Sequence, residues 1–204
     1  ADLEVKLKEA ASCRSRIIVT DGSFSMDGTI AQLDKIVELA EKYDALVMVD
    51  ECHSAGVVGE TGRGVTELYN IRGQVDIITG TLGKAFGGAI GGFTTGRKEI
   101  IELLRQRSRP YLFSNSIPPA VANAGIRMFD MMSKTAELQI RLHENTEYFV
   151  SAMIKAGFDI KKLGNFTSET IASNTPKFSP DLQYLLDSAR YILSKIAATS
   201  DKAD

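Results

Sequence analysis

The chain has 204 residues, of which 44% are hydrophobic and 25% are charged, and its formal net charge at pH 7 is −2. This composition is typical of a globular protein with a sizeable core, and the lack of a basic surplus argues against nucleic acid or an anionic membrane surface as the main partner. Two cysteines and two histidines are too few for a zinc site at standard spacing or a disulfide framework, so we expect no metal and a reducing compartment.

Helices and strands are predicted to alternate along most of the chain. Apolar residues at helical spacing predict helices over residues 2–11, 33–40, 66–69, 98–107 and 119–156, the last interrupted near Ser133. Short apolar runs bounded by turn residues predict strands over residues 16–20, 45–50, 75–80 and 91–96. Because these strands are apolar on both faces and separated by helices, we expect an α/β fold with a mostly parallel sheet covered by helices.

The stretch GTLGKAFGG, residues 80–88, places Lys84 among glycine and apolar residues, where an ammonium finds little hydration. A buried lysine becomes a nucleophile toward an aldehyde, because desolvation favours its neutral amine. Asp50 ends the second predicted strand, at the edge of a parallel sheet where ligands bind. If the aldehyde belongs to pyridoxal phosphate, Asp50 would hold the proton on the pyridine nitrogen and His53 would orient the ring. Further hydroxyls at this edge come from Ser25, Thr79 and Thr81.

Simpler explanations stand beside this one. Taken singly, Lys84 is more often a solvated surface lysine, Asp50 a turn or helix cap, and His53 a structural histidine. A phosphate-binding P-loop would need glycine in place of Ile78 and serine or threonine in place of Ala85. The glycines of GETGRG do not match the dinucleotide fingerprint either, so a nicotinamide enzyme is disfavoured.

Four stretches, taken together and in order, resemble the α-oxoamine synthases, which are pyridoxal-phosphate enzymes. They are VTDGSFSMDGTIAQL, MVDECHSAGVVGETGRG, DIITGTLGKAFGGAIGG and LRQRSRPYLFSNSIPP. The resemblance implies part of the large domain of the aspartate-aminotransferase-like fold (fold type I). It also implies that Lys84 carries the cofactor covalently and that Asp50 pairs with the pyridinium nitrogen. Contacts to the phenolic oxygen would come from His53 and Ser25, and a contact to the phosphate from Thr81.

The resemblance also implies a reaction and an assembly. The chain is most similar to family members that join glycine and acetyl-CoA, with loss of CoA, or run this reaction backward in threonine breakdown. Lys84 would then remove the α-proton of glycine. These enzymes are homodimers with shared sites, and Ser114 matches the position that reaches the phosphate of the neighbouring subunit.

The family pattern suggests three parts of this chain. Residues 1–130 would belong to the cofactor-binding large domain, residues 131–164 would begin a small C-terminal domain, and residues 165–204 would be a divergent tail with a loop and one helix. The chain therefore resembles the central segment of a longer enzyme. A catalytically silent partner chain and an enzyme with another acyl-CoA donor remain alternatives. We expect a mitochondrial location for a eukaryotic source and a cytoplasmic one for a bacterial source.

Overall fold

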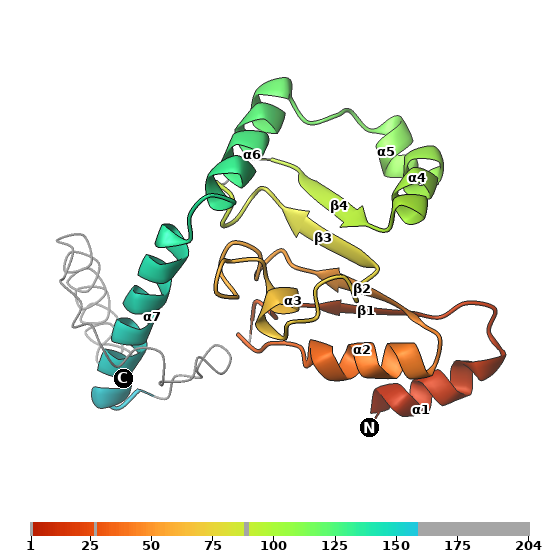
Figure 1. The fold of residues 1–204 in the computed structure, drawn as a ribbon, viewed down its shortest axis with the longest axis horizontal. Helices are drawn as coiled ribbons and strands as arrows, with labels where there is room; N and C mark the ends of the chain where they lie inside the picture. Colours follow the sequence, from red (N-terminus) through yellow and green to blue (C-terminus); the bar gives the residue numbers. More distant parts are fainter. Residues whose placement is uncertain (1, 27, 88–89, 159–204) are drawn as a thin grey trace, which may run out of the picture.

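A computed structural model describes residues 2–26, 28–87 and 90–158 (Figure 1). Its sheet has the strand order β1-β2-β3-β4, in which β1, β2 and β3 are parallel and β4 is antiparallel to β3. The strands are β1 (Ile17–Asp21), β2 (Leu46–Asp50), β3 (Ile77–Thr81) and β4 (Gly92–Gly96). Each lies within two residues of the run that predicts it, so the expectation of a mostly parallel sheet is confirmed.

The helices follow the predicted order with two differences. They are α1 (Asp2–Glu9), the short 3-10 helix η1 (Ala10–Ser12), α2 (Leu33–Lys42), α3 (Val65–Leu68), α4 (Lys98–Arg107), α5 (Arg109–Phe113), α6 (Pro119–Met132) and α7 (Glu137–Lys155). The short α5 is not predicted by the sequence pattern, and the break near Ser133 is complete. The predicted divergent tail over residues 165–204, with its loop and helix, lies outside the described residues.

The core lies on one face of β1 and β2. Alternate strand residues point into it, and α2 and α3 supply the opposing side chains. Its most deeply buried apolar members are Leu33, Val47, Val49 and Val65, each at most 1% exposed. Burial of each such side chain contributes roughly 1.5–3 kcal/mol.

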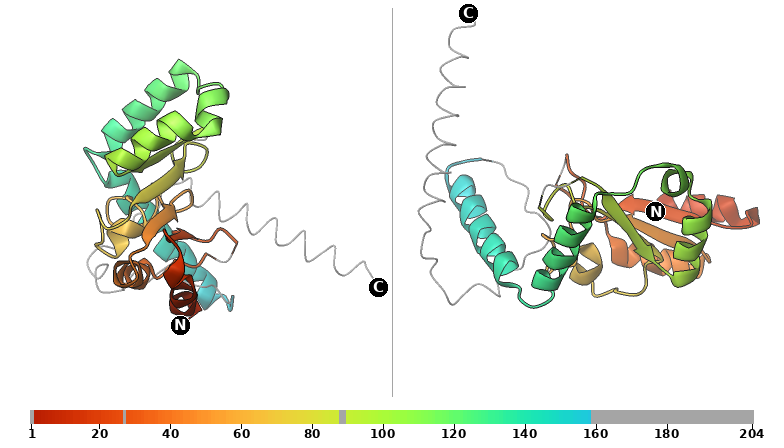
Figure 2. Two further views of the ribbon diagram at one scale, coloured as in Figure 1. Left: turned by 90° about the vertical axis from the view of Figure 1, so that its right-hand side faces the viewer. Right: turned by 90° about the horizontal axis from the view of Figure 1, so that it is seen from above.

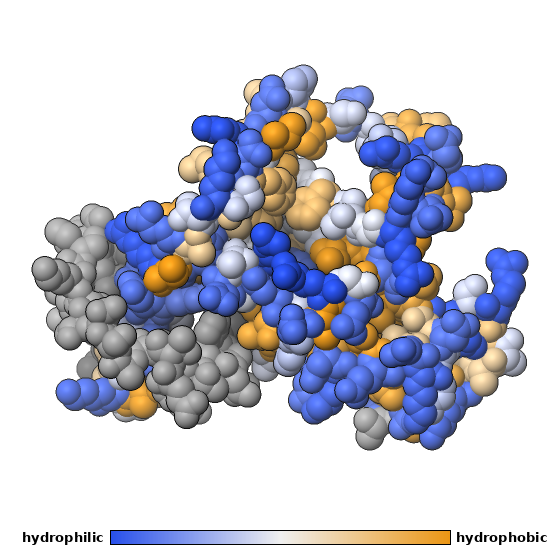
Figure 3. All heavy atoms as spheres, viewed as in Figure 1, coloured by the Kyte–Doolittle hydropathy of each residue, from blue (hydrophilic) through white to orange (hydrophobic). Residues whose placement is uncertain are grey.

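The other face of β1 departs from the expectation of a sheet covered by helices. Ile17 is 52% exposed and Val19 is 61% exposed, so no described helix covers their side chains. Exposed apolar residues are also carried by α4, α5 and α6, and Figure 3 shows apolar side chains at the surface over these helices. The most exposed of these side chains are those of Leu103, Tyr111, Phe113 and Ile126.

The helices after the sheet lie at its two ends. Figures 1 and 2 show α4 and α5 at the end where β4 stops, and α7 beyond the end where β1, β2 and β3 stop. On α7, Gln139 is 5% exposed and contacts the glycine-rich loop at Gly62, and a ring nitrogen of His143 lies 3.0 Å from the carbonyl oxygen of Val57. No helix in the described ranges has the length and apolar character to cross a membrane.

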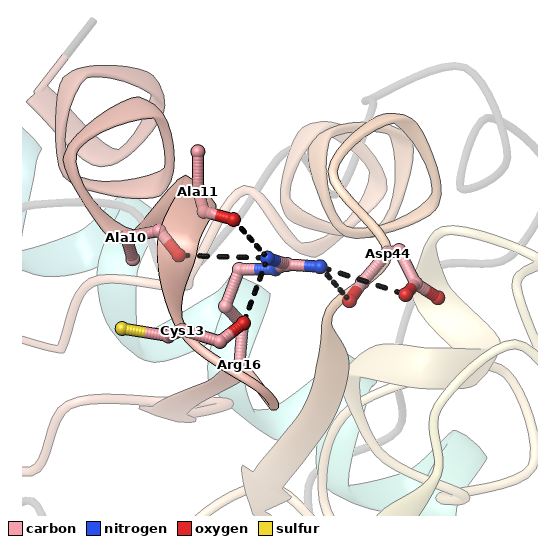
Figure 4. A network of polar contacts seen from close by, with 5 residues as sticks. All are labelled: Ala10, Ala11, Cys13, Arg16 and Asp44. Carbon is pink, nitrogen blue, oxygen red and sulfur yellow. Dashed lines mark hydrogen bonds and ion pairs between the residues drawn. The ribbon is translucent and has the colours of Figure 1, made fainter.

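Arg16 joins the first helical segment to the turn before β2. Its guanidinium donates to the carbonyl oxygens of Ala10, Ala11 and Cys13 at 3.3–3.4 Å, and on the other side to the carbonyl oxygen of Asp44 at 3.3 Å (Figure 4). The Arg16 side chain is only 16% exposed, whereas the Asp44 carboxylate with which it pairs at 3.5 Å is fully exposed. The carbonyl contacts therefore account for most of what Arg16 contributes.

The variant Arg16→Ala should lower the free energy of unfolding by about 1–2 kcal/mol, because several hydrogen bonds to a charged group are lost together. Urea denaturation followed by circular dichroism measures this. Arg14→Ala, at an exposed neighbour, should change the value by less than about 0.5 kcal/mol. Asp44→Asn should resemble that control, since exposed ion pairs contribute little. A large loss in Asp44→Asn would instead assign the effect to the ion pair.

Candidate active site

Parallel pairing brings three strand ends to one level. In the register of the sheet Asp21 pairs with Asp50, and Asp50 pairs with Thr79. The loops that follow β1, β2 and β3 therefore leave the sheet side by side, and they carry Ser25, His53 and Lys84 respectively. This is the edge at which the sequence predicts the site.

Lys84 and His53 meet at this edge. Lys84 Nζ lies 2.7 Å from His53 Nε2, although the two residues are 31 positions apart in the chain. An ammonium group has only hydrogens to donate, so Nε2 accepts and the neutral imidazole carries its proton on Nδ1 when Lys84 is charged. A ring nitrogen within hydrogen-bond distance of an amine is an arrangement that can position a nucleophile.

The sequence left open whether Lys84 is buried or solvated. Among the described residues its side chain is exposed. Local composition indicated burial, but exposure depends on which other segments cover the turn.

Asp50 lies next to this pair as the last residue of β2. Burial opposes its charge, but hydrogen bonds from Cys52 and smaller contributions from Thr79 and Lys84 together outweigh that effect and hold the pKa of Asp50 below its usual value. The clearest of these bonds runs from the Cys52 N–H to Asp50 Oδ1 at 2.8 Å. Asp50 is therefore a charged carboxylate, as an aspartate that pairs with a pyridinium nitrogen must be.

The hydroxyl of Thr79 is also available to a ligand at this edge. It is buried and lies near enough to Asp50 to favour the carboxylate, yet it makes no hydrogen bond within normal geometric limits. Buried polar groups usually have a partner. A buried hydroxyl without one, beside a charged carboxylate, fits a site that holds a polar ligand.

The remaining predicted residues are less close to one another. Thr81 Oγ1 accepts from the N–H of Gly83 at 3.1 Å and lies 3.3 Å from the carbonyl oxygen of Gly91, so it shapes the turn that carries Lys84. Ser25 is exposed on the loop after β1, and its hydroxyl bonds to no described residue. Ser114 directly follows α5 and is also exposed. Figure 1 shows α5 at the opposite end of β3 from the turn with Lys84, so Ser114 does not join this cluster within one chain.

Glu51 is a residue of this region that the sequence analysis does not single out. It follows Asp50 and is only 2% exposed. Its partners lie in the loop after β2 and at the start of α3, and none of them indicates a carboxylate partner when read alone. No group of three or more His, Cys, Asp or Glu side chains arranged to hold a metal occurs within the described ranges.

The sequence matches the model of a known protein family. The family model described as "Aminotransferase class I and II" matches residues 1–196. The chain belongs to this family. The sheet and the position of Lys84 at the carboxyl end of β3 are therefore part of a fold type I large domain, which confirms the predicted fold class.

The chain is similar in sequence to several named enzymes. Over 162 residues the chain is 57% identical to the 2-amino-3-ketobutyrate coenzyme A ligase of Salmonella typhimurium, which covers 78% of this chain and 41% of that protein. It is 53% identical to the mitochondrial enzyme of the same name from Mus musculus, with 78% and 38% covered. An 8-amino-7-oxononanoate synthase from Thermosipho melanesiensis is 49% identical, with 78% and 40% covered. The resemblance read from the sequence is confirmed, and the chain spans about 40% of the length of these relatives.

Solved structures agree with the sequence relatives. A high-resolution structure of SPT with the PLP internal aldimine superposes with a TM-score of 0.71 at 36% identity, covering 78% of this chain and 39% of that one. A serine palmitoyltransferase from Sphingomonas wittichii superposes with the same TM-score at 32% identity, covering 79% and 41%. These neighbours support the fold over the described residues.

The contact between Asp50 and Cys52 leads to a test of the site geometry. Burial first, and then the hydrogen bond and negative charge of Asp50, raise the pKa of Cys52 from 9.0 to about 11. The variant Asp50→Asn should lower this pKa, and each unit increases the thiolate fraction about tenfold. Alkylation of Cys52 by iodoacetamide at pH 9.0, followed by mass spectrometry, should therefore become several-fold faster. Exposed Cys13 is the control in the same molecule. An unchanged Cys52 rate, or equal acceleration at Cys13, would contradict the placement of Asp50.

Proposed function

We propose that this chain carries the cofactor site of a glycine C-acetyltransferase, a pyridoxal-phosphate enzyme that joins glycine and acetyl-CoA into 2-amino-3-ketobutyrate and releases CoA. The observation that carries the proposal is the contact of Lys84 with His53 beside the charged Asp50, at the carboxyl ends of β2 and β3. Relatives named 2-amino-3-ketobutyrate coenzyme A ligase support the choice of substrates. The reverse reaction would serve threonine degradation.

The described residues fit pyridoxal phosphate. Lys84 would bind its aldehyde carbon, and Asp50 would pair with its ring nitrogen. The phenolic oxygen would lie against His53 and Ser25, and Thr81 would contact the phosphate. The buried hydroxyl of Thr79, beside Asp50, offers one further polar contact. When bound, the cofactor joins covalently to an amino group and withdraws electrons from the adjacent carbon.

Side chains of the protein would hold and remove protons during that reaction. The Asp50 carboxylate would keep the proton on the ring nitrogen, because its negative charge stabilises the cationic ring. Lys84 Nζ, once released by glycine, would remove the α-proton as general base. His53 Nε2, at 2.7 Å from Nζ, would orient the amine toward the cofactor.

A homodimer with shared sites agrees with the position of Ser114. This residue lies beyond α5, at the end of β3 away from Lys84, and its hydroxyl is exposed. A second copy could therefore receive Ser114 at the phosphate of its own cofactor. The exposed apolar residues of α4 to α6 would supply surface for such an assembly.

Two alternatives have specific support. The identity to an 8-amino-7-oxononanoate synthase favours a related enzyme with another acyl-CoA donor. The exposed apolar residues of α4 to α6 are compatible with a catalytically silent chain that pairs with another subunit. The name of the mouse relative supports a mitochondrial location for a eukaryotic source, and a bacterial source would imply a cytoplasmic one.

The chain mixed with pyridoxal phosphate should develop a visible absorbance band that Lys84→Ala abolishes, because the side-chain amine forms the covalent bond. Reduction with borohydride and peptide mapping should place the label on Lys84. Lys98→Ala is the matched control, since Lys98 is a surface lysine with 81% of its side chain exposed. No band in the wild-type chain, together with a stable dimer by light scattering, would favour the silent partner.

Asp50→Asn should still bind the cofactor while exchange of the glycine α-proton with solvent falls by orders of magnitude, because an amide cannot hold the ring proton by charge. Proton NMR of glycine in deuterated buffer measures this exchange. Equal exchange rates in the variant and the wild type would remove Asp50 from this role.

A further inference from the structure

We propose that Glu51 is a positioning residue whose buried carboxylate holds Asp50 and His53 in place at the cofactor site. The proposal rests on the function proposed above. Glu51 lies between these two residues in the chain and is 2% exposed, so its side chain cannot itself reach a ligand. It acts through the loop that it anchors.

The carboxylate of Glu51 accepts hydrogen bonds from the segment that follows His53. Its oxygens accept from the backbone N–H of Val65 at 3.0 and 3.1 Å and from that of Thr66 at 3.3 Å, which begin α3. The hydroxyl of fully buried Ser54 donates to Oε2. A buried carboxylate is tolerated only when its oxygens are satisfied, and here every donor comes from the loop and helix after β2.

Two glycines leave room for the carboxylate. A Cβ on Gly22 would lie 2.7 Å from Glu51 Oε2, and one on Gly64 would lie 2.5 Å from the same atom. Gly22 opens the loop that carries Ser25, and its N–H donates to the carbonyl oxygen of Asp50 at 2.8 Å. The loop after β1 therefore packs directly against Glu51.

The backbone of Glu51 completes the anchor. Its N–H donates to the carbonyl oxygen of Thr79 at 2.9 Å, which ties the end of β2 to β3. Its carbonyl oxygen accepts from the N–H groups of Ser54 at 3.1 Å and Ala55 at 2.8 Å, and this closes a turn around His53. Side chain and backbone together fix the residues on both sides of Glu51, and the precision of a site depends on such support.

Glu67, on α3, provides a matched control because its carboxylate binds the same loop. Its carboxylate accepts from the Thr61 hydroxyl at 2.6 Å and from the N–H groups of Thr61 and Arg63 at 3.1 and 3.0 Å. It therefore caps loop donors as Glu51 does, but it bonds to none of the strand ends that carry the site. Loss of Glu67 should destabilise the loop without displacing Asp50 or His53.

The test compares Glu51→Gln with Glu67→Gln by two measurements. The chain has two histidines, so the imidazole NMR signal of His53 in the cofactor-free protein can be assigned with the variant His53→Asn. Glu51→Gln should shift this signal and weaken pyridoxal phosphate binding, followed by absorbance, about tenfold or more. Glu67→Gln should leave the signal in place and the affinity within about twofold.

If circular dichroism shows that Glu51→Gln does not fold, Ser54→Ala serves as the test variant. It removes one donor to the same carboxylate and should shift the His53 signal in the same direction by a smaller amount. The proposal is rejected if folded Glu51→Gln or Ser54→Ala keeps the wild-type signal and affinity, if Glu67→Gln changes both as much, or if both test variants unfold. Absence of cofactor binding in the wild type would instead reject the proposed function, while the His53 signal still decides the role of Glu51.

Discussion

The register of the parallel strands is the constraint on which the site depends. Because Asp21, Asp50 and Thr79 occupy one level across β1, β2 and β3, the loops after these strands begin at a common edge. Burial of Val47 and Val49 fixes that register, since a slip of one residue would turn both side chains out of the core. Lys84 and His53 are far apart in sequence. They meet because the strand register brings the loops after β2 and β3 to the same edge of the sheet.

The strands and the site edge could be predicted from the sequence because both have local signals. Continuous apolar runs ending in turn residues give the strands, and a carboxylate at a strand end gives Asp50. The helix α5 could not be found in this way, because it is five residues long and Pro110 stands at its start, where proline reads as a turn. The exposure of Ile17 and Val19 was also not predictable, since an apolar residue does not indicate what covers it.

Glu51 illustrates the other limit of sequence reasoning. Its carboxylate is satisfied by Ser54, Val65 and Thr66, and its space is left by Gly22 and Gly64. None of these residues indicates a carboxylate partner when read alone. Only the folded backbone shows that the glycine positions are required by the close approach of one side chain, and that this side chain lies between the loop after β1 and the loop after β2.

The exposure of Lys84 changes how its reactivity is best explained. Desolvation can favour a neutral lysine, but it requires cover, and the described residues leave this side chain at the surface. A neighbouring side chain acts in a different way, because it can fix where the amine lies. His53 Nε2 lies 2.7 Å from Nζ, so the imidazole orients the side chain that the proposed function makes the nucleophile. Under that proposal the position of His53 is as important as that of the lysine.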